Sequence, residues 1–410
     1  MAPITLTSED VARARGIGRG RMMNVEIVGG GPAGLYFALL MKRQDPDLRV
    51  RVIEQNPAGA TYGWGVVFSD LALSFLAESD PDSYRDIEAR LETWTDQAIV
   101  HRGQMVRIDG LGFSGIARLH LLGILQDHCR QRGVELKFDT RVDDLRGLDG
   151  ADLIVGADGV NSVVRERHRA AFQPAVETLS NRYIWYGTTR VFDCLTLTFR
   201  ENADGAFVAH HYRFSPTYST FIVECDAETW ARAGLERMSD EASRRYCEAL
   251  FQDDLGGEPL LGPHAAWLNF RVVTTRRWSH GRMVLLGDAL RTVHFSIGSG
   301  TRMALEDAIA LARACAEHAD VASALRAFEE ARRPVTEKIL SVAARSFGWY
   351  ERFREQLHQD PLAFAHGYVM RSGRISPERL RQRSPRFAAA WEAYRRAPAA
   401  GSGPTPPDRA

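Results

Sequence analysis

The sequence predicts an α/β protein in which a parallel sheet with helices is interrupted by an antiparallel sheet and followed by further helices. A short, mainly apolar run at 25–28 ends in a glycine, and a wholly apolar run at 153–157 ends in an acid, as is typical of buried parallel strands. Between residues 181 and 274 the pattern instead alternates in the manner of antiparallel strands, with turn residues between the runs. The stretch 322–394 is amphipathic at helical spacing. These patterns indicate two lobes, with a ligand pocket where they meet.

The first unit is a strand, a glycine-rich turn and a helix. An apolar strand runs into Gly29, Gly31 and Gly34, and a helical pattern follows at once. In such a Gly-x-Gly-x-x-Gly turn, the glycines allow a tight turn, a close approach of backbone to a pyrophosphate, and close packing of helix on strand. The next strand, 49–53, ends at Glu54, which stands 20 residues after Gly34, where an acid binds a ribose. The unit therefore predicts a dinucleotide site, which NAD and FAD would both fit.

The composition limits the classes of partner. The chain has 410 residues, enough for two or three domains, and its 52 basic and 52 acidic residues leave no overall charge that favours nucleic acid or an anionic membrane. No apolar run approaches the ~18 residues of a membrane span. The five cysteines are scattered and include no Cys-x-x-Cys pair, which argues for a reducing compartment and against a disulfide frame or a metal site. We therefore expect a cytoplasmic protein with a small-molecule ligand. The composition does not decide between a monomer and a homodimer, and both stay open.

Changes of pattern divide the chain into segments. We expect a disordered leader at the start and a loose tail, rich in Pro, Ala and Gly, at the end. The parallel-strand pattern stops at the antiparallel insert and resumes at 283–286, so the dinucleotide domain is formed by two stretches. In chain order, the expected segments are 1–23 (leader), 24–180 and 275–345 (dinucleotide domain, with about 70–115 contributing in part to the substrate lobe), 181–274 (β-sheet insert that binds the substrate), 346–396 (C-terminal helices) and 397–410 (tail).

Two stretches between the first unit and the insert have more than one interpretation. Tyr62–Asp70 threads glycines between bulky apolar residues, which would either let the backbone pass close to a flat ligand or mark a tight crossing of chains. Arg118 opens a helix, 117–132, that Gly133 ends. Its side chain would serve either as a ligand contact or as a solvated residue at a helix start.

Two further motifs follow the first glycine turn. Residues 158–165 read Asp-Gly-Val-Asn-Ser-Val-Val-Arg, and the strand 283–286 leads into Gly287-Asp288-Ala289 and then Gly298-Ser299-Gly300. In this order the three motifs resemble those of the class A flavoprotein aromatic monooxygenases of the p-hydroxybenzoate hydroxylase type, and the resemblance covers nearly all of residues 24–395. It implies an FAD-binding, Rossmann-like parallel-sheet domain of the glutathione-reductase type, with FAD as cofactor and NAD(P)H and O2 as co-substrates.

The resemblance assigns roles to residues of these motifs. Asp288 would accept hydrogen bonds from the ribityl chain, and amides at Gly298 and Gly300 would point at the flavin pyrimidine ring, where a helix N-terminus stabilises negative charge. Arg118 would contact the FAD pyrophosphate, and Asp158 would lie near the diphosphate and serve the use of NAD(P)H. The structural alternatives are helix capping for the two acids and a solvated position for the arginine.

The third motif departs from the common family pattern. Arg291 stands where most members have histidine, and Phe295 where most have proline. Together with Gly63–Asp70 and Tyr183–Thr189, this variant resembles the branch of salicyloyl-CoA 5-hydroxylase and the monooxygenase half of anthraniloyl-CoA monooxygenase/reductase. The resemblance implies hydroxylation, by way of a flavin hydroperoxide, of an aryl-CoA thioester such as salicyloyl-CoA at position 5.

Three alternatives stay open beside this reading. The bisindole hydroxylase of violacein biosynthesis shares several of the same stretches, which favours a free indolic or aromatic acid as an alternative substrate. Flavin-dependent halogenases share the FAD lobe but carry Trp-x-Trp-x-Ile-Pro, which is absent from this sequence. A non-catalytic FAD-fold chaperone, like those that bind small GTPases, would not need acids at Asp158 and Asp288. An enzyme is therefore the favoured prediction.

Three side chains are candidates for moving protons during hydroxylation. His294 stands just before residues 295–300, which we call the flavin loop because they are expected to contact the flavin. His210 and Tyr212 share one face of a strand of the insert. A histidine at either place could equally be a satisfied structural group. We rank His294 first because the third motif fixes its neighbourhood.

A basic run near the C-terminus is the candidate site for the phosphates of coenzyme A. Between 371 and 386, six arginines face a single acid, Glu378. They are Arg371, Arg374, Arg379, Arg381, Arg383 and Arg386. Because helical spacing would scatter them around the axis, a solvated helix face is the favoured interpretation and a phosphate site the alternative.

Overall fold

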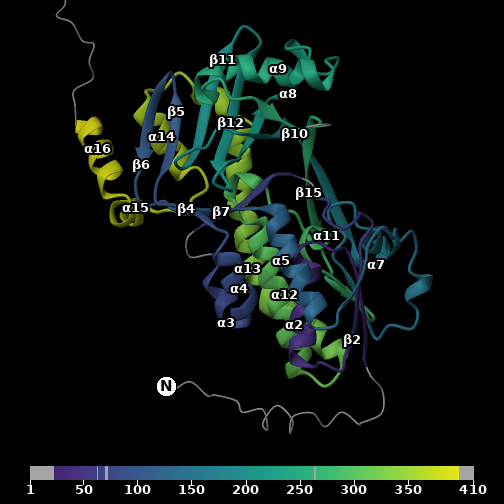
Figure 1. Ribbon diagram of the computed structural model, residues 1–410. Helices are drawn as coiled ribbons and strands as arrows, with labels where there is room; N and C mark the ends of the chain where they lie inside the picture. The colour runs from purple at the N-terminus through teal and green to yellow at the C-terminus, as the bar shows by residue number, and fades with distance from the viewer. Residues whose placement is uncertain (1–22, 62, 70–72, 263–264, 397–410) are drawn as a thin grey trace, which may run out of the picture.

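The computed structural model describes residues 23–61, 63–69, 73–262 and 265–396. Figure 1 shows a lobe with a parallel sheet at the bottom, a lobe with a large antiparallel sheet at the top, and helices that run past both. The predicted α/β class, with an antiparallel insert and C-terminal helices, is confirmed. The predicted leader as far as residue 22, the predicted tail, and Tyr62 and Asp70 of the glycine-rich stretch lie outside the described residues.

The lower lobe is built on a six-stranded sheet in the order β16-β17-β9-β1-β2-β8. Its strands are β1 (Asn24–Val28), β2 (Arg49–Ile53), β8 (Glu135–Lys137), β9 (Leu153–Gly156), β16 (Ser279–His280) and β17 (Met283–Leu285). Neighbours are parallel except β16, which pairs antiparallel with β17. The apolar run in β17 returns to the same sheet beside β9, although the whole insert separates the two strands in sequence.

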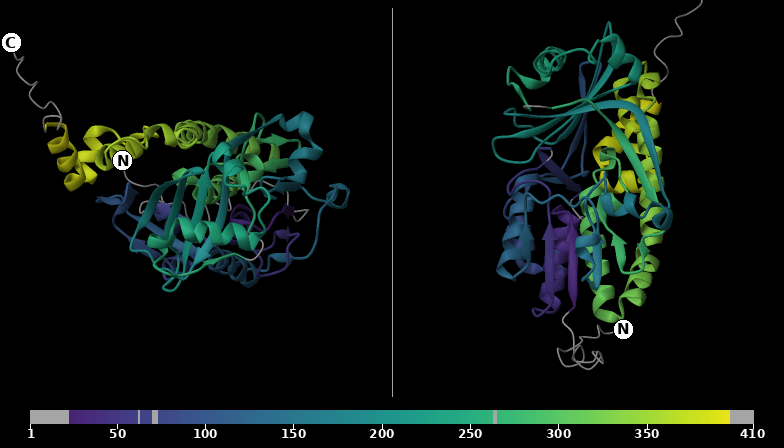
Figure 2. Two further views of the ribbon diagram at one scale, coloured as in Figure 1. Left: turned by 90° about the horizontal axis from the view of Figure 1, so that it is seen from above. Right: turned by 90° about the vertical axis from the view of Figure 1, so that its right-hand side faces the viewer.

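A layer of helices packs on this sheet: α2 (Pro32–Gln44), α5 (Arg118–Gln131), α12 (Gly300–Glu317) and α13 (Val321–Tyr350). α2 begins directly after Gly31, with Pro32 in the first turn, where the missing amide would have had no helical partner. It contacts both α5 and α12 and is buried from 32 to 42. α13 is 30 residues long and continues past the lower lobe to the antiparallel sheet, as Figures 1 and 2 show.

The upper lobe is built on an eight-stranded sheet in the order β14-β10-β13-β12-β11-β5-β6, with β15 paired to β10. Six strands come from the region of the insert: β10 (Pro174–Thr188), β11 (Leu195–Asn202), β12 (Gly205–Arg213), β13 (Ser219–Cys225), β14 (Leu260–Leu261) and β15 (Leu268–Thr275). β5 (Gln97–His101) and β6 (Gln104–Ile108) come from earlier in the chain, and β5 pairs in parallel with β11. The sheet is therefore completed by residues far from the insert in sequence.

Both faces of this sheet are covered. Phe207 and Ala209 pack with residues of the helices α8 (Ala227–Arg232), α9 (Asp240–Leu250) and α10 (Gln252–Leu255). Val208, between them in sequence, packs with Tyr368 and other residues of the C-terminal helices. Side chains alternate between faces along a strand, so two-sided burial explains why β12 is apolar at successive positions.

The C-terminal helices are held by the turn that follows β6. They are α14 (Pro361–Met370), α15 (Pro377–Arg383) and α16 (Pro385–Arg396). The Asp109 carboxylate accepts hydrogen bonds from the amides of Arg386 and Phe387, at 3.2 and 2.9 Å. A Cβ at Gly110, whose φ is +68°, would lie 1.8 Å from the carbonyl oxygen of Arg383. The turn therefore needs glycine at 110 to dock α15 and α16.

A three-stranded sheet in the order β3-β7-β4 connects the lobes. Its strands are β3 (Gly65–Ser69), β4 (Glu92–Trp94) and β7 (Phe113–Ala117), with α3 (Ser74–Ser79) and α4 (Pro81–Glu88) between them in sequence. A Cβ at Gly63 would lie 2.7 Å from the ring of Trp185, and one at Gly65 would lie 2.5 Å from Phe214. The glycine-rich stretch is thus a tight crossing at residues 63–65.

The remaining elements are short: α6 (Val163–Arg167), α7 (Arg169–Phe172), α11 (Gly287–Leu290), and the 3-10 turns η1 (Arg146–Leu148), η2 (Phe295–Ile297) and η3 (Phe353–Gln356). Among the described residues, no helix combines the length and the apolar character needed to cross a bilayer.

Candidate active site

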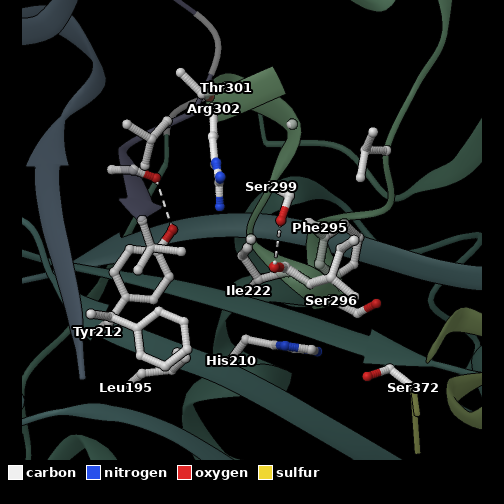
Figure 3. Close-up of a pocket in the computed structure, with 18 of the residues that line it drawn as sticks. Leu195, His210, Tyr212, Ile222, Phe295, Ser296, Ser299, Thr301, Arg302 and Ser372 are labelled. Carbon is white, nitrogen blue, oxygen red and sulfur yellow. Dashed lines mark hydrogen bonds between the residues drawn. The ribbon is translucent and has the colours of Figure 1, made fainter. Parts of the chain in front are cut away.

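A cavity of about 590 Å³ lies where the two lobes and the C-terminal helices meet, and its volume suits a cofactor-sized ligand. Figure 3 shows part of its wall, with Thr301 and Arg302 at the start of α12 on one side and His210 and Tyr212 of β12 on the other. Of the predicted site residues, the wall contains Gly31, Arg118, His210, Tyr212, Asp288, Gly298 and Gly300. Gly29, Gly34, Glu54, Asp158 and His294 are not part of it.

The glycines of the first turn divide into two kinds. A Cβ at Gly29 would lie 2.2 Å from the carbonyl oxygen of Ala157, and one at Gly34 would lie 2.2 Å from that of Gly29. These two positions therefore need glycine for packing of the turn and of α2. A Cβ at Gly31 would meet no atom within 4 Å, and Gly31 lines the cavity. Its amide and the start of α2 leave open the space that a pyrophosphate would occupy.

Glu54 stands beside this turn, at the end of β2. Its Oε2 accepts a hydrogen bond from the amide of Gly30 at 2.7 Å, and its Oε1 accepts one from the amide of Asn56 at 2.9 Å. The carboxylate is thereby fixed next to the glycine turn, which is the place expected for an acid that binds a ribose.

Asp158 accepts hydrogen bonds at the start of α6, a helix whose N-cap residue is Ser162. Its Oδ2 accepts a hydrogen bond from the amide of Val163 at 2.6 Å, at the start of α6. Burial raises the pKa of Asp158, against hydrogen bonds from Ser162 and from backbone amides. Its Oδ1 is buried and has no hydrogen-bond partner in the described part of the chain. The capping alternative is therefore realised, and one acceptor is left for a second role.

Arg118 and Asp288 put opposite charges in the cavity wall. Arg118 Nε donates to Thr61 Oγ1 at 2.9 Å. Desolvation lowers the pKa of Arg118, and the charge of Asp288 opposes this shift. The carboxylate of Asp288 is open to the cavity, whose walls desolvate it and raise its pKa, against the charges of Arg118 and Arg291. The arrangement suits a pyrophosphate contact and a ribityl contact, respectively.

The N-terminus of α12 opens into the cavity. Gly298 (φ +59°) turns the chain, and the helix runs for 18 residues from Gly300. The Ser299 hydroxyl donates to the carbonyl of Ile297 at 3.1 Å and does not cap the helix (Figure 3). The amides of the first turn have no partners within the helix, so they and the helix dipole are available to an anionic or electron-rich ligand group.

His210 belongs to a buried pair whose acid the sequence did not single out. Its Nε2 lies 3.3 Å from Oε2 of Glu224 on β13, and Asn181 Nδ2 donates to Oε1 of the same carboxylate at 2.8 Å. Burial alone would raise the pKa of Glu224, but its bond to His210, the charges of His210 and His294, and the Asn181 bond hold it below the ordinary value. Glu224 is therefore ionised and fixes the ring of His210. The sequence signal that could have identified Glu224 is its position as the one acid in the otherwise uncharged run 219–225.

The other two candidates for proton transfer have structural partners. Tyr212 donates its hydroxyl to the carbonyl of Gly65 at 2.9 Å (Figure 3), and burial raises its pKa. The Nδ1 of His294 accepts from the amide of Ser296 at 3.2 Å, and burial lowers the pKa of His294 to about 4. The ring of Phe295 stacks on His294, with ring centroids 4.3 Å apart. The fold thus brings His210 and Tyr212, but not His294, to the cavity surface.

The two departures from the family pattern have different surroundings. Arg291 is 3% exposed and forms an ion pair with Asp307 of α12 at 2.6 Å. Because Arg291 Nη1 also donates to the carbonyl of Gly287 at 3.3 Å, it ties the turn that carries Asp288 to that helix. Phe295 lines the cavity, with its ring centroid 5.4 Å from that of His210.

Comparison with known sequences agrees with this geometry. The family described as FAD binding domain matches residues 22–343. Salicyloyl-CoA 5-hydroxylase of a Streptomyces species is 42% identical over 361 residues, which cover 85% of this chain and 70% of that protein. Protodeoxyviolaceinate monooxygenase of Chromobacterium violaceum is 37% identical over 87% of this chain and 96% of that protein. A Streptosporangium sibiricum 5-monooxygenase of 3-hydroxy-4-methyl-anthranilyl on an aryl-carrier protein is 36% identical over 80% and 90%, respectively.

Solved structures share the fold. The tetrameric form of 2-methyl-3-hydroxypyridine-5-carboxylic acid oxygenase has a TM-score of 0.67 at 19% identity, covering 89% of this chain and 96% of that one. PqsL of Pseudomonas aeruginosa in complex with 2-aminobenzoylacetate has a TM-score of 0.64 at 21% identity, covering 82% and 98%. At such identities the likeness concerns the architecture of the two lobes.

Proposed function

This chain belongs to the FAD-binding-domain family and is a flavin-dependent aromatic monooxygenase, and we propose that its substrate is an aromatic acid held as a coenzyme A thioester, such as salicyloyl-CoA, hydroxylated at position 5. NAD(P)H is the proposed reductant and O2 the oxidant. The observation that carries the proposal is the cavity, which extends from the start of α12 through an apolar chamber under the insert sheet to arginines of the C-terminal helices. The 42% identity to salicyloyl-CoA 5-hydroxylase supports the choice of ring and carrier.

The wall formed by the lower lobe suits FAD. When bound, FAD supplies the reduction of O2 and the transfer of one oxygen atom to the ring. The open space at Gly31 and the charge of Arg118 would hold its pyrophosphate, and Asp288 would accept from its ribityl hydroxyls. The amides at 298–300 and the dipole of α12 would stabilise negative charge placed beside them.

Apolar side chains surround the space where the substrate ring would lie. They include Trp185, Leu195, Leu197, Ile222 and Phe295. Water that entered this space would divert the reduced oxygen to hydrogen peroxide. An apolar wall therefore favours transfer of oxygen to the ring over that loss.

His210 is the proposed proton acceptor for the substrate's hydroxyl or amino group. Removing that proton enriches the ring in electrons and so promotes attack on an electrophilic oxygen. Glu224 acts as a positioning residue, because its ionised carboxylate holds Nε2 of His210. His294 stays a prediction as a relay residue behind Phe295, and Tyr212 fixes the chamber wall through Gly65.

Variants of the two histidines test these roles. We expect His210→Gln to lower the rate of hydroxylation about a hundredfold or more, within the range of general base catalysis, with FAD content unchanged. His294→Gln should have the smaller effect, again on hydroxylation more than on FAD binding. An unaltered rate of hydroxylation in both variants would contradict the assignment.

The function itself is tested with a panel of substrates. FAD-loaded protein is given NADH or NADPH and, in separate reactions, salicyloyl-CoA, anthraniloyl-CoA, free salicylate and indolic acids. We expect reductant oxidation to be stimulated by the aryl-CoA thioesters, with a product heavier by one oxygen atom. Stimulation by free acids alone would contradict the proposal that the substrate is a thioester.

The second candidate is hydroxylation of a free indole, a bisindole or an aromatic acid. The 37% identity to protodeoxyviolaceinate monooxygenase over 96% of that protein favours it. The same panel separates the two candidates. The non-catalytic alternative is not retained, because the relatives are monooxygenases.

A further inference from the structure

The fold sorts the C-terminal arginines into groups with different surroundings. Arg381 Nε lies 2.9 Å from Oε1 of Glu392, and Arg386 Nε lies 3.5 Å from Oδ2 of Asp109. Neither lines the cavity. These two arginines are paired on the outside of the C-terminal helices.

Arg371 is part of the cavity wall, but its guanidinium group already donates hydrogen bonds to other residues of the protein. Its Nη2 donates to the carbonyl of Ser296 at 2.7 Å and its Nε to Ser346 Oγ at 3.1 Å. Its guanidinium carbon also lies 3.8 Å from the ring centroid of Tyr368. Arg371 therefore links Ser296 to α13 and α14, and three of its five donors are already bonded to protein atoms.

Apart from Arg118 and Arg371, four arginines line the cavity and form what we call the arginine cluster: Arg302, Arg374, Arg379 and Arg383. Arg302 lies in the first turn of α12 and points into the cavity in Figure 3, while its Nε lies 2.7 Å from Glu306 Oε1. The other three side chains are exposed and have no ion pair with any acid in the described part of the chain. The positive charge of the cluster is therefore largely uncompensated.

The four groups line one cavity, and the charges of the others act on Arg374. Desolvation lowers the pKa of Arg374, and the charges of Arg302, Arg383, Arg379 and Arg371 lower it further. Like charges that are held together without acids raise the free energy of the unliganded protein. An anion placed among them removes that penalty and gains charge-assisted hydrogen bonds.

We propose that the arginine cluster binds the phosphate groups of coenzyme A while the aryl end of the thioester lies in the apolar chamber. This inference rests on the proposed function and specifies how its substrate is recognised. Guanidinium forks match phosphate oxygens, and several of them suit a ligand with several phosphates better than a single carboxylate. The FAD pyrophosphate has a separate expected place, at Gly31 and Arg118 of the lower lobe. The cluster instead belongs to α12 and to the chain from 374 to 383.

Matched variants on one helix provide the test. Arg379→Ala/Arg383→Ala removes two members of the cluster, and Arg381→Ala removes an arginine of the same helix that is paired with Glu392. FAD-loaded proteins are titrated with salicyloyl-CoA, with salicyloyl-pantetheine, which lacks all phosphates, and with coenzyme A alone. We expect the double variant to raise the Kd of both coenzyme A ligands about tenfold and that of the pantetheine ester less than about twofold.

The control and the salt dependence sharpen the result. Arg381→Ala should leave all three Kd values within about twofold of wild type. Binding of coenzyme A ligands to wild type should weaken with rising salt more steeply than binding to the double variant, because screening acts on the charges that the variant lacks.

Three outcomes would overturn the inference: equal weakening by the control and the double variant, equal weakening for the pantetheine ester, or a change in the KM of NADPH without a change in the Kd of coenzyme A. Failure of the proposed function looks different. Wild type would then form no hydroxylated product from any aryl-CoA thioester, while the titration with coenzyme A alone would still decide whether the cluster binds its phosphates.

Discussion

Two groups of arginines lie near acids of α12, and they differ in how their charge is balanced. Arg291 and Arg332 are 3% and 9% exposed and surround Asp307, with Arg291 Nη2 2.6 Å from Oδ2 and Arg332 Nε 3.0 Å from Oδ1. The arginine cluster on the cavity side has Glu306 as its one acid in the described part of the chain. Glu306 also pairs with Arg332, at 3.0 Å, so it stands between the two groups.

The difference in paired acids distinguishes a group that stabilises the fold from a group whose charge is open to a ligand. Buried guanidinium groups persist only when acids offset their desolvation, so the buried group acts as a clamp between α11, α12 and α13. Exposed arginines without acids contribute nothing comparable to the fold, and the proposed binding of an anion would explain their grouping. The presence or absence of paired acids thus distinguishes the buried arginines from the arginine cluster more clearly than their spacing in the sequence does.

The largest expected effect breaks the buried clamp. Asp307→Ala leaves two buried guanidinium groups without their shared partner, so we expect the free energy of unfolding to fall by about 3–5 kcal/mol. Urea unfolding of the FAD-loaded variant measures it. Glu392→Ala, which removes the surface partner of Arg381, is the control and should cost at most about 1 kcal/mol. Equal losses in both variants would remove the distinction between the groups.

A smaller effect concerns a buried group that stays neutral because it has no such acid partner. His294 has a pKa lowered from 6.5 to about 4 by burial and by the charges of His210 and Arg371, against that of Glu224. Because the unfolded chain then binds more protons between these values, stability falls as the pH drops from about 6.5 towards 4. We expect His294 to account for a loss on the order of 3 kcal/mol across that window.

The measurement is the free energy of unfolding as a function of pH in wild type and His294→Gln, which keeps an acceptor for the amide of Ser296. The difference between the two curves isolates His294 from other buried histidines, such as His211, whose pKa burial lowers to about 3. Parallel curves between pH 6.5 and 4 would show that His294 is not held neutral in the folded protein.

The smallest expected effect concerns the arginine cluster rather than the buried group. Arg374→Gln removes a charge that other arginines repel, so the free energy of unfolding should stay unchanged or rise by up to about 0.5 kcal/mol at low salt. The gain should vanish at high salt. A loss of 2 kcal/mol or more (about the scale of a broken buried interaction) would mean that Arg374 has a structural partner and that the cluster is a second clamp.

Much of the cofactor side of the cavity could be predicted because it depends on short local sequences. The turn at Gly29–Gly34 brings its own strand, helix and open amides, and the turn at 287–300 does the same. Gly31, Asp288, Gly298 and Gly300 line the cavity as a consequence. Asp158 and Glu54 lie behind its wall, where their acceptors are fixed by neighbouring amides.

The substrate side was harder because its contacts join residues distant in sequence. The role of Glu224 could not be predicted from its own stretch of sequence, because only the pairing of β13 with β12 places its carboxylate at His210. His294, ranked first for its motif, lies behind Phe295, because the flavin loop turns its ring towards Tyr350 and Phe347 and away from the cavity. Neighbours in sequence did not predict which of these two rings would face the cavity.

The sequence alone determined the α/β architecture, the dinucleotide turn and the family, since each follows from short local patterns and their order along the chain. The tertiary structure decided which arginines gather at the cavity and which are paired away from it. The reason is physical: α15 presents Arg379, Arg381 and Arg383 within two turns, and docking of this helix at Gly110 selects the side that faces the cavity. Charge balance at a site is a property of all the elements that meet there, and no single stretch of sequence contains it.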